Sequence, residues 1–225
     1  MTFKGDVKKG QSLFHVPETK LKNLLVPLVP KRIETYHLTI TTILWSILII
    51  VSSFLARYNI NWLWFTSFMI FAQYITDLLD GEIGRRRKTG LIKWGFYMDH
   101  FLDYIFLLSI LIGYSMLLPD KYKFILFYIF ALFGAFMVNS FLSFAATNEF
   151  KIAYLGIGPT EIRLIFIIIN TLLIIFGKTY LAPALPYVLF FSTIGLIITV
   201  YKTQKYIWKI DMDNLKKESN KRGRK

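Results

Sequence analysis

Six long apolar stretches alternate with short polar segments along most of this 225-residue chain. Each stretch approaches the roughly 20 apolar residues that a helix needs to cross the hydrocarbon core of a bilayer. The pattern therefore predicts an all-α, polytopic membrane protein with six transmembrane helices. We expect these helices at about residues 38–57, 62–83, 95–118, 123–146, 160–177 and 182–203.

The segment before the first apolar stretch is polar and basic, but leucines recur in it at helical spacing. Leu21, Leu24, Leu25 and Leu28 stand among lysines, which is typical of an amphipathic helix lying in the membrane interface. The alternative is a disordered basic tail. We expect three parts: an N-terminal cytoplasmic or interfacial segment at 1–35, a six-helix transmembrane domain at 36–204, and a basic cytoplasmic tail at 205–225.

The charges indicate how the chain is oriented in the membrane. The formal net charge is +13, yet only 18% of the residues are charged, fewer than the roughly 25% of a soluble domain. Basic residues gather at both ends and around Arg85–Lys93, and such clusters mark the cytoplasmic side of membrane proteins. With six spans, both termini then lie in the cytoplasm. Because the same residues explain the charge, we expect no nucleic-acid partner.

Four aspartates lie near the ends of two neighbouring predicted helices. Asp77 and Asp80 stand three residues apart on the second helix, and Asp99 and Asp103 stand four apart on the third. Residues at these spacings share one helix face. Since a short loop joins the two helices, they must run antiparallel, and the four carboxylates can converge near the cytoplasmic rim of the bundle.

Ionised carboxylates at membrane depth are costly and repel one another, so bound cations are the economical way to keep them together. The chain has no cysteine, and oxygen ligands favour Mg²⁺, Mn²⁺ or Ca²⁺ over zinc. Two such ions about 3.5–4 Å apart suit phosphoryl chemistry, because they stabilise both the attacking and the leaving oxygen.

This region resembles the signature of the CDP-alcohol phosphotransferase family, which is Asp-x2-Asp-Gly-x2-Ala-Arg, a spacer, and Gly-x3-Asp-x3-Asp. Two departures are visible. Gly84 stands where the family usually has alanine, and the spacer of nine residues is one longer than usual. Neither departure removes a ligand. The residues that match the signature are Asp77, Asp80, Gly81, Arg85, Gly95, Asp99 and Asp103.

The resemblance implies an integral membrane enzyme of phospholipid biosynthesis that transfers a phosphoalcohol group from a CDP-linked donor to an acceptor hydroxyl and releases CMP. It implies two divalent ions, Mg²⁺ or Mn²⁺, with Asp103 as the general base and a homodimer as the usual assembly. The cytoplasmic rim would then hold the active site. By the same resemblance, the metal ligands are Asp77, Asp80, Asp99 and Asp103.

Three further signature residues are candidates for binding the CDP-linked donor. Gly81 and Gly95 stand beside the acids on the two helices, where a glycine permits close approach of a phosphate or of a facing backbone. Packing of the helices alone explains them equally well. Arg85 follows one turn after Gly81, and its guanidinium could hold a phosphate.

A second polar group opens the fifth predicted helix. Glu161 and Arg163 follow Pro159, which is well placed at a helix start. They are candidates for binding the acceptor or its headgroup, and helix capping is the alternative. The Thr160-Glu161 pair is similar to one in eukaryotic choline and ethanolamine phosphotransferases. It marginally favours CDP-choline or CDP-ethanolamine as donor to diacylglycerol over CDP-diacylglycerol as donor to a small alcohol.

The competing class of function is a cation- or proton-coupled transporter, in which intramembrane acids also mark the pathway. A transporter favours acids near the midplane and broken helices in two related halves, and the sequence has neither. For His100 we expect packing or hydrogen bonding rather than metal ligation, and His37 and Asn139 are weaker candidates for lining the cavity.

Overall fold

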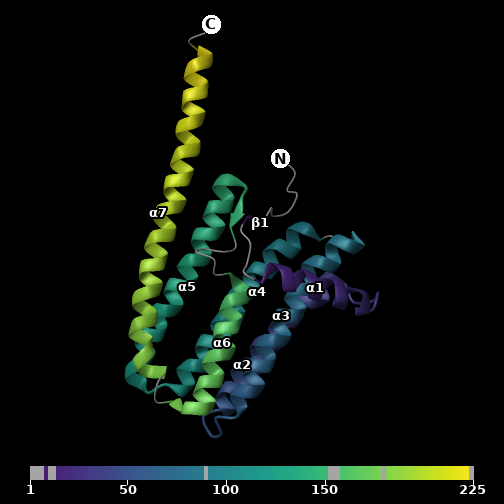
Figure 1. Cartoon of the computed structure of the whole chain (residues 1–225), viewed down its shortest axis with the longest axis vertical. Coiled ribbons are helices and arrows are strands. Elements are labelled where there is room, and N and C mark those ends of the chain that lie inside the picture. Colours follow the sequence, from purple (N-terminus) through teal and green to yellow (C-terminus); the bar gives the residue numbers. More distant parts are fainter. Residues whose placement is uncertain (1–7, 10–13, 89–90, 152–157, 179–180, 223–225) are drawn as a thin grey trace.

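The computed structural model describes residues 8–9, 14–88, 91–151, 158–178 and 181–222. Parts of the predicted N-terminal segment (1–7 and 10–13) and of the basic tail (223–225) lie outside the described residues. The described chain is a bundle of long helices (Figure 1). The helices are α1 (His15–Leu25), the 3-10 turn η1 (Val26–Leu28), α2 (Thr35–Leu55), α3 (Trp62–Arg87), α4 (Ile92–Leu117), α5 (Asp120–Thr147), α6 (Pro159–Phe176) and α7 (Leu181–Arg222). Two short strands, β1 (Lys8–Lys9) and β2 (Phe150–Lys151), pair in parallel.

Each predicted span coincides with one helix from α2 to α7. Within the described residues, five of these helices are long and apolar enough to cross a membrane, namely α2, α4, α5, α6 and α7. The sixth, α3, has 26 residues, about 39 Å at 1.5 Å per residue, but it is absent from that set. Polar side chains such as Gln73, Asp77 and Asp80 lie within α3 and lower its apolar content.

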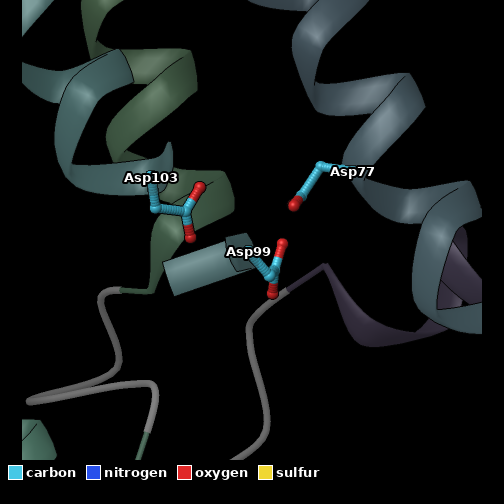
Figure 2. A group of neighbouring side chains, drawn as sticks. All are labelled: Asp77, Asp99 and Asp103. Atoms are coloured by element: carbon cyan, nitrogen blue, oxygen red, sulfur yellow. The ribbon is translucent and has the colours of Figure 1, made fainter. Parts of the chain in front are cut away.

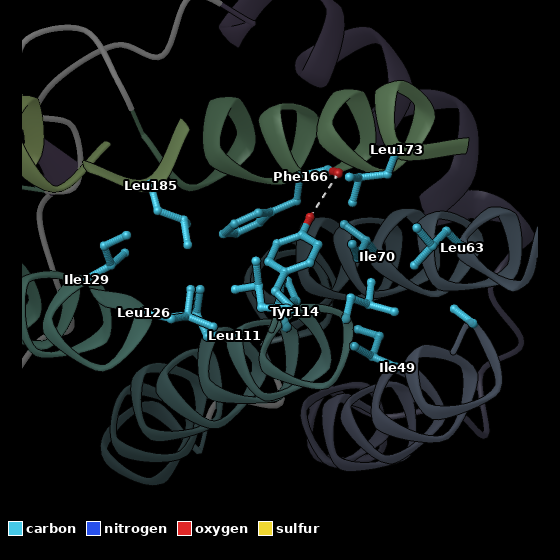
Figure 3. Packing of buried hydrophobic residues seen from close by; sticks show 14 of the residues in the cluster. Ile49, Leu63, Ile70, Leu111, Tyr114, Leu126, Ile129, Phe166, Leu173 and Leu185 are labelled. Atoms are coloured by element: carbon cyan, nitrogen blue, oxygen red, sulfur yellow. Dashed lines mark hydrogen bonds between the residues drawn. The ribbon is translucent and has the colours of Figure 1, made fainter. Parts of the chain in front are cut away.

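The bundle is built around α2, which packs against both α3 and α4, while α6 packs against α3 and α5 packs against α7. At the crossing of α2 and α4, a Cβ on Gly113 would lie 2.8 Å from the Ser53 Cβ, so a glycine is needed for this close approach. Apolar side chains such as Ile49, Leu63 and Ile70 fill the centre (Figure 3). The packed helices hold the ends of α3 and α4 at a fixed separation.

Buried polar side chains link the helices across this core. The Tyr114 hydroxyl of α4 donates to Asn170 Oδ1 of α6 at 3.0 Å and lies 3.3 Å from the Phe166 carbonyl (Figure 3). Asn170 Nδ2 in turn donates to Ser67 Oγ of α3 at 3.1 Å. Because apolar contacts between helices resemble contacts with lipid, such hydrogen bonds help to fix which helices pair.

The N-terminal segment contains a helix, α1, which contacts α3 and the start of α6; that it is amphipathic and lies in the membrane interface stays a prediction. Arg86, in the last turn of α3, donates to Asn23 Oδ1 of α1. Arg87 next to it donates to the carbonyls of Val29 at 2.9 Å and of Ile33 at 2.6 Å, in the segment that joins η1 to α2. The Thr160 hydroxyl at the start of α6 donates to Glu18 of α1 at 2.6 Å. In Figure 1, α1 lies crosswise at the end of the bundle where α3 ends and α4 begins.

The last helix is much longer than a membrane span. α7 has 42 residues, about twice the roughly 20 that cross a bilayer. Its C-terminal half extends beyond the other helices (Figure 1). The predicted basic tail is therefore helical as far as Arg222, and it lies at the same end of the bundle as the end of α3.

Candidate active site

Three of the four signature aspartates meet at the rim of the bundle. Asp77 comes from α3, and Asp99 and Asp103 come from successive turns of α4. One carboxylate oxygen of each lies within 4.8 Å of the others, and Figure 2 shows the three side chains around one shared space. The prediction that antiparallel helices bring these acids together is thus confirmed for three of them. All three are half-buried.

The charge of these acids is partly neutralised by a buried arginine. Arg163 Nη2 lies 3.1 Å from Asp77 Oδ2 and 3.1 Å from Asp103 Oδ1, and the Arg163 side chain is only 6% exposed. The guanidinium also lies 5.6 Å from the centre of the Phe106 ring, within range of a cation–π interaction. Arg163 therefore joins α6 to the acids of α3 and α4.

Gln73 holds the other side of this guanidinium. Arg163 Nε donates to Gln73 Oε1 at 2.7 Å, and Gln73 is fully buried. Gln73 precedes Asp77 by one helical turn on α3, so the same helix face supplies a carboxylate and a neutral acceptor to one arginine. The arrangement orients the fork of Arg163 toward the two carboxylates.

Asp80 has a different environment from the other acids. It is 8% exposed, and the Thr39 hydroxyl of α2 donates to its Oδ2 at 2.6 Å. It is not a member of the group formed by Asp77, Asp99 and Asp103. In this structure Asp80 thus connects α3 to α2, and its predicted role as a metal ligand stays a prediction.

The signature glycines differ in the space that surrounds them, and the signature arginine is largely exposed. A Cβ on Gly95 would have no neighbour within 4 Å, whereas one on Gly81 would lie 3.3 Å from Arg85 Nη1. The Arg85 side chain is 60% exposed and pairs with Glu82 at 2.9 Å. Gly84, where the family usually has alanine, leaves room for Thr35, whose Cγ2 would lie 2.9 Å from an added Cβ. The close approach of α2 explains this departure.

Glu161 is engaged in capping its own helix. Its Oε2 accepts a hydrogen bond from the Gly158 backbone N–H at 2.9 Å, and its side chain is buried. This satisfies one of the donors that a helix N-terminus leaves unpaired. Of the two acceptor-binding candidates in this motif, Arg163 alone contacts the aspartates among the contacts observed.

The histidines have local roles. His100 Nδ1 lies 3.6 Å from Asp99 Oδ2, and its ring stacks on Phe141 at 5.6 Å between centroids, in line with the expected packing role. His37 Nδ1 accepts the backbone N–H of Glu34 at 3.1 Å and so caps α2. Asn139 lines a cavity of about 550 Å³ between α4, α5 and α7, and the aspartate cluster is not part of its lining.

The donor set of the cluster fits a hard divalent cation. Three carboxylates supply oxygen ligands within a radius suited to a shared ion, and the chain has no thiolate that would favour a softer metal. Oxygen-only sites of this kind are typical of Mg²⁺, Mn²⁺ and Ca²⁺. Gly95 stands one turn before Asp99 on α4, and an added Cβ there would have no neighbour within 4 Å, so a phosphate could approach this part of the helix closely.

Gln73, Phe106 and Thr39 were not identified from the sequence as parts of the site. Gln73 could have been predicted as a site residue, because it is an amide in an apolar helix, four residues before Asp77. Polar residues within transmembrane helices commonly face the bundle interior and mark functional sites. Phe106 and Thr39 carried no such signal, since each depends on how separate helices pack.

A family comparison agrees with this geometry. No curated protein and no solved structure matches the chain. A sequence profile of the CDP-alcohol phosphatidyltransferase family matches residues 35–201, from the first residue of α2 into α7, and includes every signature residue. The chain therefore belongs to the CDP-alcohol phosphatidyltransferase family and is a membrane transferase of phospholipid biosynthesis.

Proposed function

We propose that this protein transfers a phosphoalcohol group from a CDP-linked donor to an acceptor hydroxyl, with release of CMP, at the cluster of Asp77, Asp99 and Asp103. The observation that carries the proposal is the convergence of these carboxylates, within 4.8 Å of one another, inside the region that matches the family. Phosphoryl transfer is catalysed mainly by positioning and by electrostatic stabilisation, and a rim of carboxylates can supply both through bound cations.

The residues divide the reaction between metal binding and proton transfer. Asp77, Asp80, Asp99 and Asp103 would hold two Mg²⁺ or Mn²⁺ ions. Asp80 would either exchange its hydrogen bond from Thr39 for an ion or keep that bond and lie outside the direct ligands. When bound, such ions would neutralise the pyrophosphate of the donor and the charge that develops on CMP.

Asp103 is the proposed general base. It accepts the proton of the acceptor hydroxyl as the hydroxyl oxygen bonds to phosphorus. The bond from phosphorus to the CMP oxygen breaks, and CMP leaves with the electron pair. Asp103 is 26% exposed in its side chain, which leaves it reachable from the rim.

The donor is proposed to lie over Gly81, Arg85 and Gly95. Gly95 has open space around it, so the CDP moiety can approach the start of α4 closely. Arg85 is exposed, and among the described residues its guanidinium pairs with the neighbouring carboxylate of Glu82. It can exchange Glu82 for a phosphate at little cost.

Two donor arrangements suit the site. CDP-choline or CDP-ethanolamine could react with diacylglycerol, or CDP-diacylglycerol could react with a small alcohol. Thr160 and Glu161 resemble a pair in choline and ethanolamine phosphotransferases. Here Thr160 bonds to Glu18 and Glu161 bonds to Gly158, so both side chains already take part in hydrogen bonds within the protein. Arg163 is the better candidate for contact with an acceptor, because it already reaches the aspartates.

The proposed topology has six spans, with α3 as the second, and both termini and the active site in the cytoplasm. Basic residues at the end of α3 and in the tail support this orientation. We also propose that α1 and η1 lie in the membrane interface, since Leu24 of α1 and Leu28 of η1 remain 66% and 71% exposed. A homodimer is proposed from the family alone.

A panel of substrate pairs tests the function. Purified protein in detergent would be supplied with Mg²⁺ or Mn²⁺ and with each donor–acceptor pair, and CMP would be measured. Metal-dependent CMP release with one pair would support the proposal and identify the substrates. No release from any pair, together with no binding of a CDP-linked donor, would contradict it and would favour a transport function.

A further inference from the structure

We propose that Gln73 is a positioning residue for the metal site: it fixes the guanidinium of Arg163 so that this arginine holds Asp77 and Asp103 in the geometry that binds a divalent cation. The inference rests on the proposed metal-dependent function and extends it to a residue outside the family signature. Its basis is a continuous chain of short contacts, from Gln73 Oε1 to Arg163 Nε at 2.7 Å and from Arg163 Nη2 to both carboxylates at 3.1 Å.

The contacts leave Arg163 little freedom. Its Nε is bound to Gln73, its Nη2 faces two carboxylates, and Phe106 lies 5.6 Å from its central carbon. The guanidinium is planar, so fixing the Nε–H direction also fixes the direction of the Nη2 fork. Without the acceptor on Gln73, the same arginine could rotate and reach one carboxylate at a time.

The surroundings of Gln73 indicate a role beyond filling space. Its side chain is fully buried, yet its Nε2 has no hydrogen-bond partner among the residues that the structure describes. An unpaired buried amide hydrogen is unfavourable, so an apolar side chain would suit a position that served packing alone. Among the described residues, the side-chain hydrogen bond of Gln73 is made by its oxygen alone, which accepts from Arg163.

Gln73 would affect the two carboxylates that are proposed to bind the ion directly. Asp77 stands on α3 and Asp103 on α4, and Arg163 of α6 is the group that bonds both. Outer partners that orient metal ligands commonly change metal affinity by about 10–100-fold when they are removed. Gln73 acts one step further out, through the arginine, and so should affect the affinity for the ion without touching it.

The test is Mn²⁺ binding by the full-length protein in detergent, measured from the electron paramagnetic resonance signal of free Mn²⁺. We expect Gln73→Leu to weaken binding by about 10-fold or more and Gln73→Glu, which keeps an acceptor oxygen, to bind close to wild type. A packing role predicts the opposite order, because leucine suits an apolar interior and a carboxylate does not. Thr66→Val, which removes another buried hydrogen bond of α3, should leave Mn²⁺ binding unchanged.

A second variant protects the test against simple misfolding. Arg163→Lys keeps the charge but loses the Nε donor, so it should reproduce the defect of Gln73→Leu, and the double variant should be no weaker than either single one. Wild-type affinity in Gln73→Leu, or additive losses in the double variant, would overturn the positioning role alone. A wild-type protein that binds no Mn²⁺ would overturn both this inference and the proposed metal site.

Discussion

Asp103 has contacts suited to both of its proposed roles. Its Oδ1 receives a hydrogen bond from Arg163 at 3.1 Å, and its side chain remains 26% exposed toward the rim. The hydrogen bond from the guanidinium orients the carboxylate, while its exposure allows an acceptor hydroxyl to approach. Asp99, one turn earlier on α4, shares the same space (Figure 2).

Replacement of Asp103 by asparagine removes the base but keeps the shape of the side chain. We expect Asp103→Asn to lower the rate of CMP release by about 10²–10⁴-fold, the usual contribution of general base catalysis, with the donor still bound and the protein folded. Asp120→Asn serves as the matched control, because Asp120 pairs with Lys123 at the opposite end of the bundle, away from the carboxylate cluster. Full activity of Asp103→Asn would contradict the assignment.

At the scale of single helices, the packing of α2 against α4 depends on a glycine. A side chain on Gly113 would lie 2.8 Å from the Ser53 Cβ, whereas one on Gly195 would lie 3.6 Å from the nearest ring atom of Phe136. The first contact is too short for any relaxed pair of carbons, and the second is an ordinary van der Waals contact.

We therefore expect Gly113→Ala to destabilise the protein by about 1–3 kcal/mol, as overpacking of a close contact usually does, and Gly195→Ala to be nearly neutral. Thermal unfolding in detergent, followed by tryptophan fluorescence or circular dichroism, measures both. Equal midpoints for the two variants would show that the backbones of α2 and α4 can separate at no cost.

The helices and the meeting of three aspartates could be predicted from the sequence, because both follow from local spacing. Asp99 and Asp103 share a face wherever α4 is helical, and the short loop before it starts α4 at the end of the bundle where α3 ends, although α2 packs against both helices. The position of Arg163 could not be predicted in the same way. It depends on α6 packing against α3, and residues 60 or more positions apart in the chain are not related by any periodicity.

Asp80 and Glu161 also show the difference between what local spacing predicts and what the packing of neighbouring segments determines. Asp80 shares the face of Asp77 by spacing, yet it bonds to Thr39 of α2, because α2 lies against that part of α3. Glu161 was predicted to bind the acceptor or its headgroup, with helix capping as the alternative, and it accepts the backbone N–H of Gly158 as a cap does. In both cases a neighbouring donor determines what the carboxylate does.

For the whole molecule, the proposed topology places the ends of α3 and α7 on one side of the membrane and the α2–α3 and α4–α5 connections on the other. The chain has no cysteine, so single cysteines can be introduced without a background. In sealed inside-out vesicles, Lys88→Cys and Ser219→Cys should react with a membrane-impermeant maleimide, and Asn59→Cys and Asp120→Cys should react only after permeabilisation. Labelling of Asn59→Cys and Ser219→Cys from the same side would show that the number of spans between them is even and would exclude six spans.

In the proposed function, the carboxylate cluster binds a divalent ion, and phosphoalcohol transfer takes place at that ion. The most direct measurement is the rate of CMP release as a function of Mn²⁺ concentration, compared between the wild-type protein and Asp99→Asn. We expect no release in EDTA, recovery on addition of Mn²⁺, and a half-saturating Mn²⁺ concentration raised by about 10-fold or more in the variant. CMP release that persists in EDTA, or the same Mn²⁺ dependence in both proteins, would contradict the proposed function.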